Sequence, residues 1–108
     1  MSFQKIYKVR DALLTVMDNV GHYEAMNKTD KYIVWAEDGE GDSVHGDGVK
    51  LEQVIQGTID YFTKSDEDKN ADKIQNALKE FKIPFYLSSV QYEEETGYIH
   101  YEWVWEIS

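Results

Sequence analysis

The chain has 108 residues, of which 42% are hydrophobic and 14% aromatic, and its 21 acidic and 11 basic residues give a formal net charge of −10. This apolar content excludes a disordered chain, and the length fits a single domain over residues 1–108. The scattered basic residues disfavour nucleic acid and anionic membranes as partners, because both attract clustered lysine and arginine. The lack of cysteine excludes disulfides and thiolate metal sites.

The N-terminal third predicts one helix and one strong strand. Apolar residues recur at helical spacing over residues 2–17, with Ser2 in the position of an N-cap. Residues 22–26 give a weak strand signal, and residues 27–31 resemble a polar turn. Residues 32–36 are apolar without alternation, which predicts a strand that is covered on both faces and central in the sheet.

The middle of the chain predicts a long loop, a long strand and a second helix. Residues 38–48 contain four glycines and four acids, so we expect a loop. Residues 50–64 alternate in polarity, which is typical of a strand, and Gly57 marks a bulge or bend in it. Acidic residues 66–68 suit a helix N-terminus, and Pro84 closes that helix.

The C-terminal part predicts a hairpin. Residues 85–92 form a strand, residues 93–97 turn the chain with Gly97 in a left-handed conformation, and the last strand follows. In that strand every odd position from Ile99 to Ile107 is apolar, so one face is core. The sequence therefore predicts an α+β fold in the order α-β-β-β-α-β-β, with two helices packed on a mainly antiparallel sheet of four to five strands.

The acidic loop at residues 38–48 partly matches the pattern of a calcium-binding loop. Asp38, Glu40 and Asp42 alternate as ligands do in calcium loops. The position of the turn glycine is Ser43, however, and that of the bidentate acid is Val49. We therefore expect a solvated loop and no metal.

No set of residues assembles a catalytic site. His45 lies between Asp42 and Asp47, and no two histidines have the helical spacing of zinc ligands. The chain lacks nucleophile-elbow, phosphate-loop and zinc-protease motifs. The runs of acids at 66–68 and 93–95 are explained by a helix terminus and a turn. We expect no catalytic residue and no cofactor.

An interface remains the best candidate for a functional surface. Tyrosine and tryptophan are enriched where a surface is half apolar and half polar, and several candidates fall on or near the other face of the hairpin. The candidate residues are Asp38, Glu40, Asp42, His45 and Asp47 in the loop and Tyr92, Tyr98, His100, Glu102 and Val104 in the hairpin.

The order of elements resembles a known family. The resemblance rests on the amphipathic first helix, the strand at 32–37, the loop at 38–43, the strand at 57–63, the helix at 73–78 and the closing stretch at 94–103. In these features the chain is similar to the small tail-terminator or tail-completion proteins of long-tailed bacteriophages and prophages, which are also described as minor capsid or tail components.

The resemblance implies a structural protein without catalysis. Its subunits would form a homo-oligomeric ring, usually described as hexameric, that caps the tail tube and later meets the head connector. The expected location is the bacterial host cytoplasm during assembly and the virion tail afterwards. A ring requires that one patch of a subunit meets a different patch of the next.

Two other classes of function remain open at this stage. The acidic surface suits a non-catalytic protein-binding module of the inhibitor or immunity type, which would bind a basic partner in a salt-sensitive complex. A metal-dependent enzyme would require ion binding at Asp38, Asp42 or His45.

Overall fold

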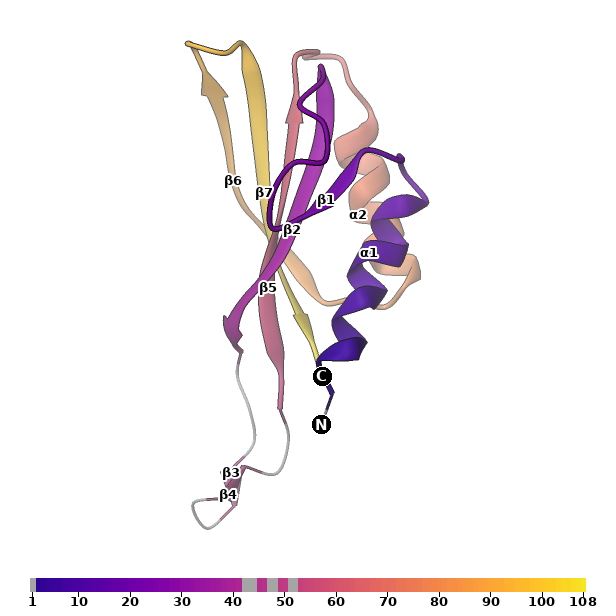
Figure 1. Ribbon diagram of the computed structural model, residues 1–108, viewed down its shortest axis with the longest axis vertical. Helices are drawn as coiled ribbons and strands as arrows, with labels where there is room; N and C mark the ends of the chain where they lie inside the picture. The colour runs from indigo at the N-terminus through magenta and orange to yellow at the C-terminus, as the bar shows by residue number, and fades with distance from the viewer. Residues whose placement is uncertain (1, 42–44, 47–48, 51–52) are drawn as a thin grey trace.

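The computed structural model describes residues 2–41, 45–46, 49–50 and 53–108, and residues 1, 42–44, 47–48 and 51–52 lie outside the description (Figure 1). The described part is an α+β fold, as predicted. Its elements are a 3₁₀ turn η1 (Phe3–Ile6), α1 (Tyr7–Leu14), β1 (Val20–His22), β2 (Lys31–Glu40), β3 (His45–Gly46), β4 (Val49–Lys50), β5 (Ile55–Thr63), α2 (Asn70–Glu80), β6 (Phe85–Glu93) and β7 (Tyr98–Ile107).

Five strands form one sheet in the order β1-β2-β5-β7-β6. All neighbouring pairs are antiparallel except β1 and β2, which are parallel. The short β3 and β4 pair with each other in a separate ribbon that extends the chain beyond the sheet (Figure 1). The prediction of a mainly antiparallel sheet is therefore confirmed, and the strands β6 and β1 lie at its opposite edges.

Both helices cover the same face of the sheet, and the core lies between them and the strands (Figure 1). In β5 buried and half-buried residues alternate over its whole length, because successive side chains point to opposite faces. The odd positions of β7 point to the helices, as predicted. The largest buried side chains are Trp35, Trp103, Trp105 and Tyr61.

The N-terminal elements differ in detail from the prediction. Ser2 does cap the first turn, because its Oγ accepts a hydrogen bond from the Gln4 amide at 3.0 Å. The regular α-helix ends at Leu14 rather than at Met17. The weak strand lies at Val20–His22 instead of residues 22–26.

The strand β2 differs from the prediction in two respects. It continues through Asp38 and Glu40, which were assigned to the loop, because Gly39 and Glu40 pair with β5 after an irregularity opposite Gly57. It is not the central strand, since β5 holds that position. The predicted coverage of both faces holds in part, because helices cover one face and, on the other, Tyr32 is buried and Val34 is half-buried.

The second half agrees closely with the prediction. The acids at 66–68 lie just before α2, separated from it by the N-cap residue Lys69, whereas α2 ends at Glu80, before the predicted end at Pro84. The strand β5 begins at Ile55, five residues later than expected. Gly97 has φ = 78° in the β6–β7 turn, as predicted for a left-handed position. Within the described residues, none of the helices has the length and apolar character needed to cross a membrane.

Candidate interaction surface

The face of the sheet opposite the helices carries four of the predicted interface residues. Tyr98, His100, Glu102 and Val104 follow one another at even positions of β7, and all four are half-buried. Tyr92, which the sequence grouped with them, pairs with Ile99 and so lies on the helix-bearing side. The structure thus brings four hairpin residues together on the open face and separates the fifth from them.

An aromatic cluster occupies one end of this open face. The Phe62 ring stacks on Tyr32 at 4.7 Å and on His100 at 4.2 Å between ring centroids, and Tyr98 packs edge-on against both Tyr32 and Phe62. The Tyr98 hydroxyl donates to the Thr29 carbonyl at 2.7 Å. This cluster therefore fastens the loop between β1 and β2 to the sheet.

His100 lies between two carboxylates. Its Nε2 is 2.7 Å from Asp60 Oδ1, and its Nδ1 is 3.4 Å from Glu93 Oε2. These contacts tie β7 to both of its neighbours, β5 and β6, so the ring joins three strands. Both nitrogens of His100 are thus engaged within the chain.

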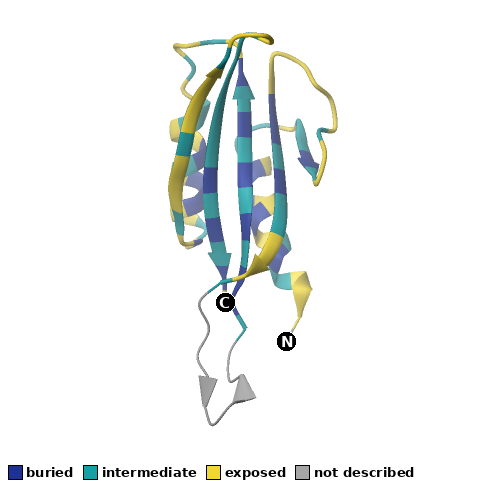
Figure 2. Ribbon diagram, turned by 90° about the vertical axis from the view of Figure 1, so that its left-hand side faces the viewer, coloured by how far each residue is buried: buried dark blue, intermediate teal, exposed yellow. Residues whose placement is uncertain are grey.

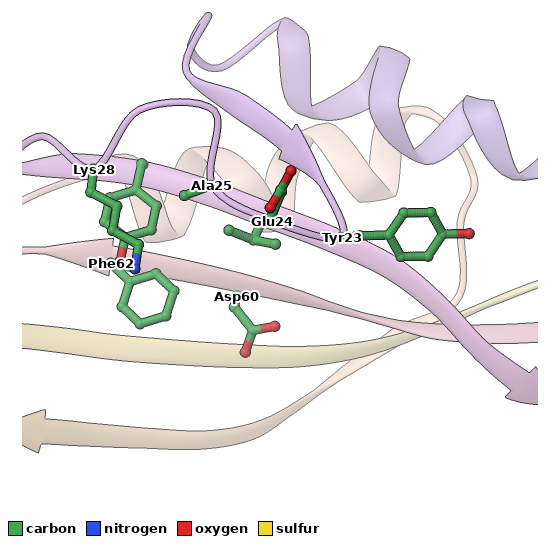
Figure 3. Close-up of a pocket in the computed structure, with 8 residues that line it drawn as sticks. Tyr23, Glu24, Ala25, Lys28, Asp60 and Phe62 are labelled. Carbon is green, nitrogen blue, oxygen red and sulfur yellow. The ribbon is translucent and has the colours of Figure 1, made fainter.

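A recess of about 360 Å³ lies between the β1–β2 loop and the open face (Figure 3). Its wall combines apolar and charged side chains, with Lys28 from the loop and Asp60 from β5 (Figure 3). The lining residues are Tyr23, Glu24, Ala25, Lys28, Tyr32, Val34, Asp60 and Phe62. Among the lining residues that the structure describes, none is a cysteine or a serine.

A second cluster of side chains surrounds His22 at the β1 edge of the sheet. The His22 ring stacks on Tyr23 at 4.0 Å and on Trp35 at 3.9 Å between centroids, and its Nε2 is 2.8 Å from Glu37 Oε1. The Tyr23 hydroxyl donates to Glu37 Oε2 at 2.5 Å, while Tyr23 itself has a left-handed φ of 71°. Burial would raise the pKa of Glu37, but the hydrogen bonds from Tyr23 and His22 outweigh it and lower that pKa.

Replacing Glu37 with glutamine should destabilise the fold by about 1 kcal/mol at neutral pH, since the amide cannot accept both hydrogen bonds. The folded-state pKa of Glu37 is lowered, so this stabilisation is present above the unfolded pKa and is lost as pH falls through the folded value. Urea unfolding at neutral and acidic pH measures the difference. The exposed neighbour Glu24→Gln is the control, and equal effects of both substitutions would contradict the prediction.

The structure describes only some of the predicted interface residues in the loop. Asp38 and Glu40 are exposed at the end of β2. Asp42 and Asp47 lie outside the described residues, and His45 is placed in β3 by its backbone alone. Among the residues that the structure does describe, no three histidine, cysteine, aspartate or glutamate side chains come together to hold a metal ion.

The edge strand β6 is largely exposed (Figure 2), and apart from Tyr92 its exposed apolar side chains were missed by the sequence reasoning. An irregularity between Leu87 and Ser89 shifts the register, so that Leu87 and Val90 both lie on the helix-bearing side, opposite Trp103 and Tyr101. We define the β6 patch as Leu87, Val90 and Tyr92, which share the helix-bearing side and are 47%, 50% and 64% exposed, whereas Tyr86, 62% exposed, pairs with Val104 on the open face. One signal was available in the sequence, because residues 83–92 contain no charged residue.

A second apolar patch lies at the opposite edge of the sheet. Tyr23, 62% exposed, follows β1 directly, and Met26, 64% exposed, lies three residues further on in the loop whose backbone packs against Gly21; we define these two residues as the β1-side patch. Figure 2 shows the loop after β1 as mostly exposed, and β1 lies at the edge of the sheet opposite β6. Among the described residues, the other exposed large hydrophobic side chains are Phe3 and Leu14 at the N-terminal helix.

Comparison of the sequence with protein-family models and with curated proteins found no match. A functional proposal for this chain therefore rests on its fold and its surface.

Proposed function

We propose that this chain is a structural, tail-terminator-like assembly protein of a bacteriophage or prophage. Its subunits form a homo-oligomeric ring that caps the tail tube and joins it to the head, without catalysis. Assembly takes place in the bacterial host cytoplasm, and the ring becomes part of the virion tail. The order of elements that resembles this family supports the proposal.

One observation carries the proposal: the two apolar patches lie at opposite edges of the same sheet. A closed ring is built from heterologous contacts, in which one patch meets a different patch of the next subunit. Two patches that are well separated on one subunit supply both halves of such a contact. A two-fold dimer would need only one of them.

The distribution of charge favours the same conclusion. The chain has a formal net charge of −10, so like copies repel one another over most of their surface. The β6 patch lies within a stretch of ten residues, 83–92, that has no charge. Contact at this stretch buries apolar surface without bringing carboxylates of two copies together.

Self-association of the purified chain is the direct test. We expect light scattering to give a mass several times that of the 12.6 kDa subunit, rising with concentration, and negative-stain images to show rings. Addition of the tail-tube protein encoded by the same genome should place the ring at tube ends. A chain that stays monomeric and ignores tail tubes would contradict the proposal.

One contrary result would point to the alternative function. A monomer that forms a 1:1 complex with a basic protein, weakened steeply by salt, would support an acidic binding module of the inhibitor or immunity type.

A further inference from the structure

We infer that the recess beneath the β1–β2 loop binds a small zwitterion, namely an α-amino acid with an apolar or aromatic side chain. In the complex Lys28 bonds the carboxylate of the ligand, Asp60 bonds its ammonium group, and apolar residues of the sheet contact its side chain. The recess lies within a single subunit, so this site does not depend on the proposed self-assembly.

The floor of the recess consists of two cross-strand pairs on the open face of the sheet. Tyr32 of β2 lies opposite Phe62 of β5, and the next pair on the same face is Val34 opposite Asp60. The rings of Tyr32 and Phe62 stack at 4.7 Å between centroids. Tyr32 is buried, while Phe62 and Val34 are half-buried. The floor is therefore apolar, with one carboxylate beside it.

The β1–β2 loop forms the roof of the recess, and the rest of the chain holds it in place. Asn19 Nδ2 donates to the Asn27 carbonyl at 2.7 Å, and the Tyr98 hydroxyl donates to the Thr29 carbonyl at 2.7 Å. The loop backbone also packs so closely on Gly21 that a Cβ there would collide with it. Because the roof is already fixed, a ligand that enters the recess has little of the chain to order.

Two charged groups that line the recess have bonding capacity left over. Figure 3 shows Lys28 reaching from the loop towards Phe62, and within the described part of the chain its ammonium makes no hydrogen bond or ion pair. Asp60 bonds His100 through Oδ1 at 2.7 Å, and its Oδ2 has no partner among the described side chains. The two floor pairs are about 7 Å apart along the strand, a gap that one α-amino acid can bridge because its ammonium and carboxylate share a carbon.

The charges of the lining select the class of ligand. A ligand with only a positive charge would meet the unpaired Lys28, and one with only a negative charge would meet Asp60 and Glu24, which also lines the recess. A zwitterion satisfies both signs.

The size of the recess limits the ligand to a single amino acid. Its volume is about 360 Å³, and a water molecule occupies about 30 Å³ in the liquid, so it has room for roughly a dozen non-hydrogen atoms. Phenylalanine has this size. A ligand so small should bind with a dissociation constant on the order of 1 mM.

Titration of the ¹⁵N-labelled chain with L-phenylalanine, followed by amide NMR shifts at neutral pH, tests the site. We expect the amide signals of residues 24–28, 32–34 and 60–62 to move together. Three analogues each remove one part of the ligand: phenylalanine amide lacks the carboxylate, N-acetylphenylalanine lacks the ammonium group and glycine lacks the side chain. Each should bind at least about fivefold more weakly than phenylalanine.

Lys28→Gln removes the partner of the ligand carboxylate, so this variant should bind phenylalanine and its amide equally well. Lys28 is exposed, and circular dichroism melting checks that the variant is folded. The matched control Lys64→Gln removes the same charge from an exposed lysine outside the lining and should keep the preference for phenylalanine. Asp60→Asn should likewise lose the preference for phenylalanine over its N-acetyl derivative.

Three results would overturn the zwitterion site. They are unmoved amide signals at a tenfold excess over the expected dissociation constant, a wild-type chain that binds phenylalanine and its amide equally, and a Lys28→Gln variant that still prefers phenylalanine. Light scattering on the same samples reports self-association separately. A chain that binds phenylalanine and stays monomeric would thus support the site and contradict the proposed function alone.

Discussion

Gly57→Ala should destabilise the protein by about 3 kcal/mol, because the added methyl group has no room. Gly57 lies in the central strand β5, where the Trp105 ring packs directly over it. A Cβ at this position would lie 2.7 Å from Trp105 Cε2 and closer still to the Ala36 carbonyl oxygen. The carbonyl belongs to the paired backbone of β2, so the strands themselves must shift.

Gly39→Ala is the matched control for this substitution. Gly39 lies in the neighbouring strand beside the same irregularity, but a Cβ there meets no atom within 4 Å. We expect a change of no more than about 1 kcal/mol, in the stabilising direction, since alanine restricts the unfolded chain. Urea unfolding of both variants gives the two free energies, and a Gly57→Ala protein as stable as the wild type would refute the close packing of Trp105.

The faces of the strands could be predicted from the sequence because alternation is a local property. Apolar residues at the odd positions of β7 indicated that Trp103 and Trp105 are core, and the structure buries both. The cap at Ser2 and the turn at Gly97 likewise depend on a few neighbouring residues. Each of these features is determined by residues within one or two turns of the chain.

The lateral order of the strands could not be predicted in this way. Nothing in the alternation of residues 85–92 shows that β6 lies at an edge, so the exposure of Leu87 and Val90 was missed. The irregularity after Leu87 also changes which face a residue occupies, which is why Tyr92 lies on the side opposite to that expected. The candidate surface thus depends on long-range pairing, and the sequence alone offered only Tyr92 as a candidate and the lack of charged residues over 83–92.

Asp68→Asn should cost about 2 kcal/mol at neutral pH, because it breaks a buried hydrogen-bond network. The Asp68 side chain is only 3% exposed, and it joins the start of α2 to the central strand. Its Oδ1 accepts from the Asn70 amide at 2.6 Å, its Oδ2 accepts from the Tyr61 hydroxyl, and Lys31 Nζ lies 3.7 Å away. An asparagine can replace only one of the two acceptors.

The cost of this substitution should fall with pH. Burial would raise the pKa of Asp68, but the hydrogen bonds from Tyr61, Thr63 and the Asn70 amide, together with the charge of Lys31, outweigh it and lower the pKa. A lowered folded-state pKa means that the stabilisation is full above the unfolded pKa and is lost as pH falls through the folded value. The wild-type and Asp68→Asn unfolding curves should therefore converge in acid.

Two further variants separate the network from general charge effects. Tyr61→Phe removes the hydroxyl donor, and its effect should not add to that of Asp68→Asn, since both break the same bond. The exposed Asp66→Asn removes the same charge outside the network and should change stability by less than about 0.5 kcal/mol. Strict additivity in the first pair, or a pH-independent cost for Asp68→Asn, would show that the carboxylate does not hold α2 to β5.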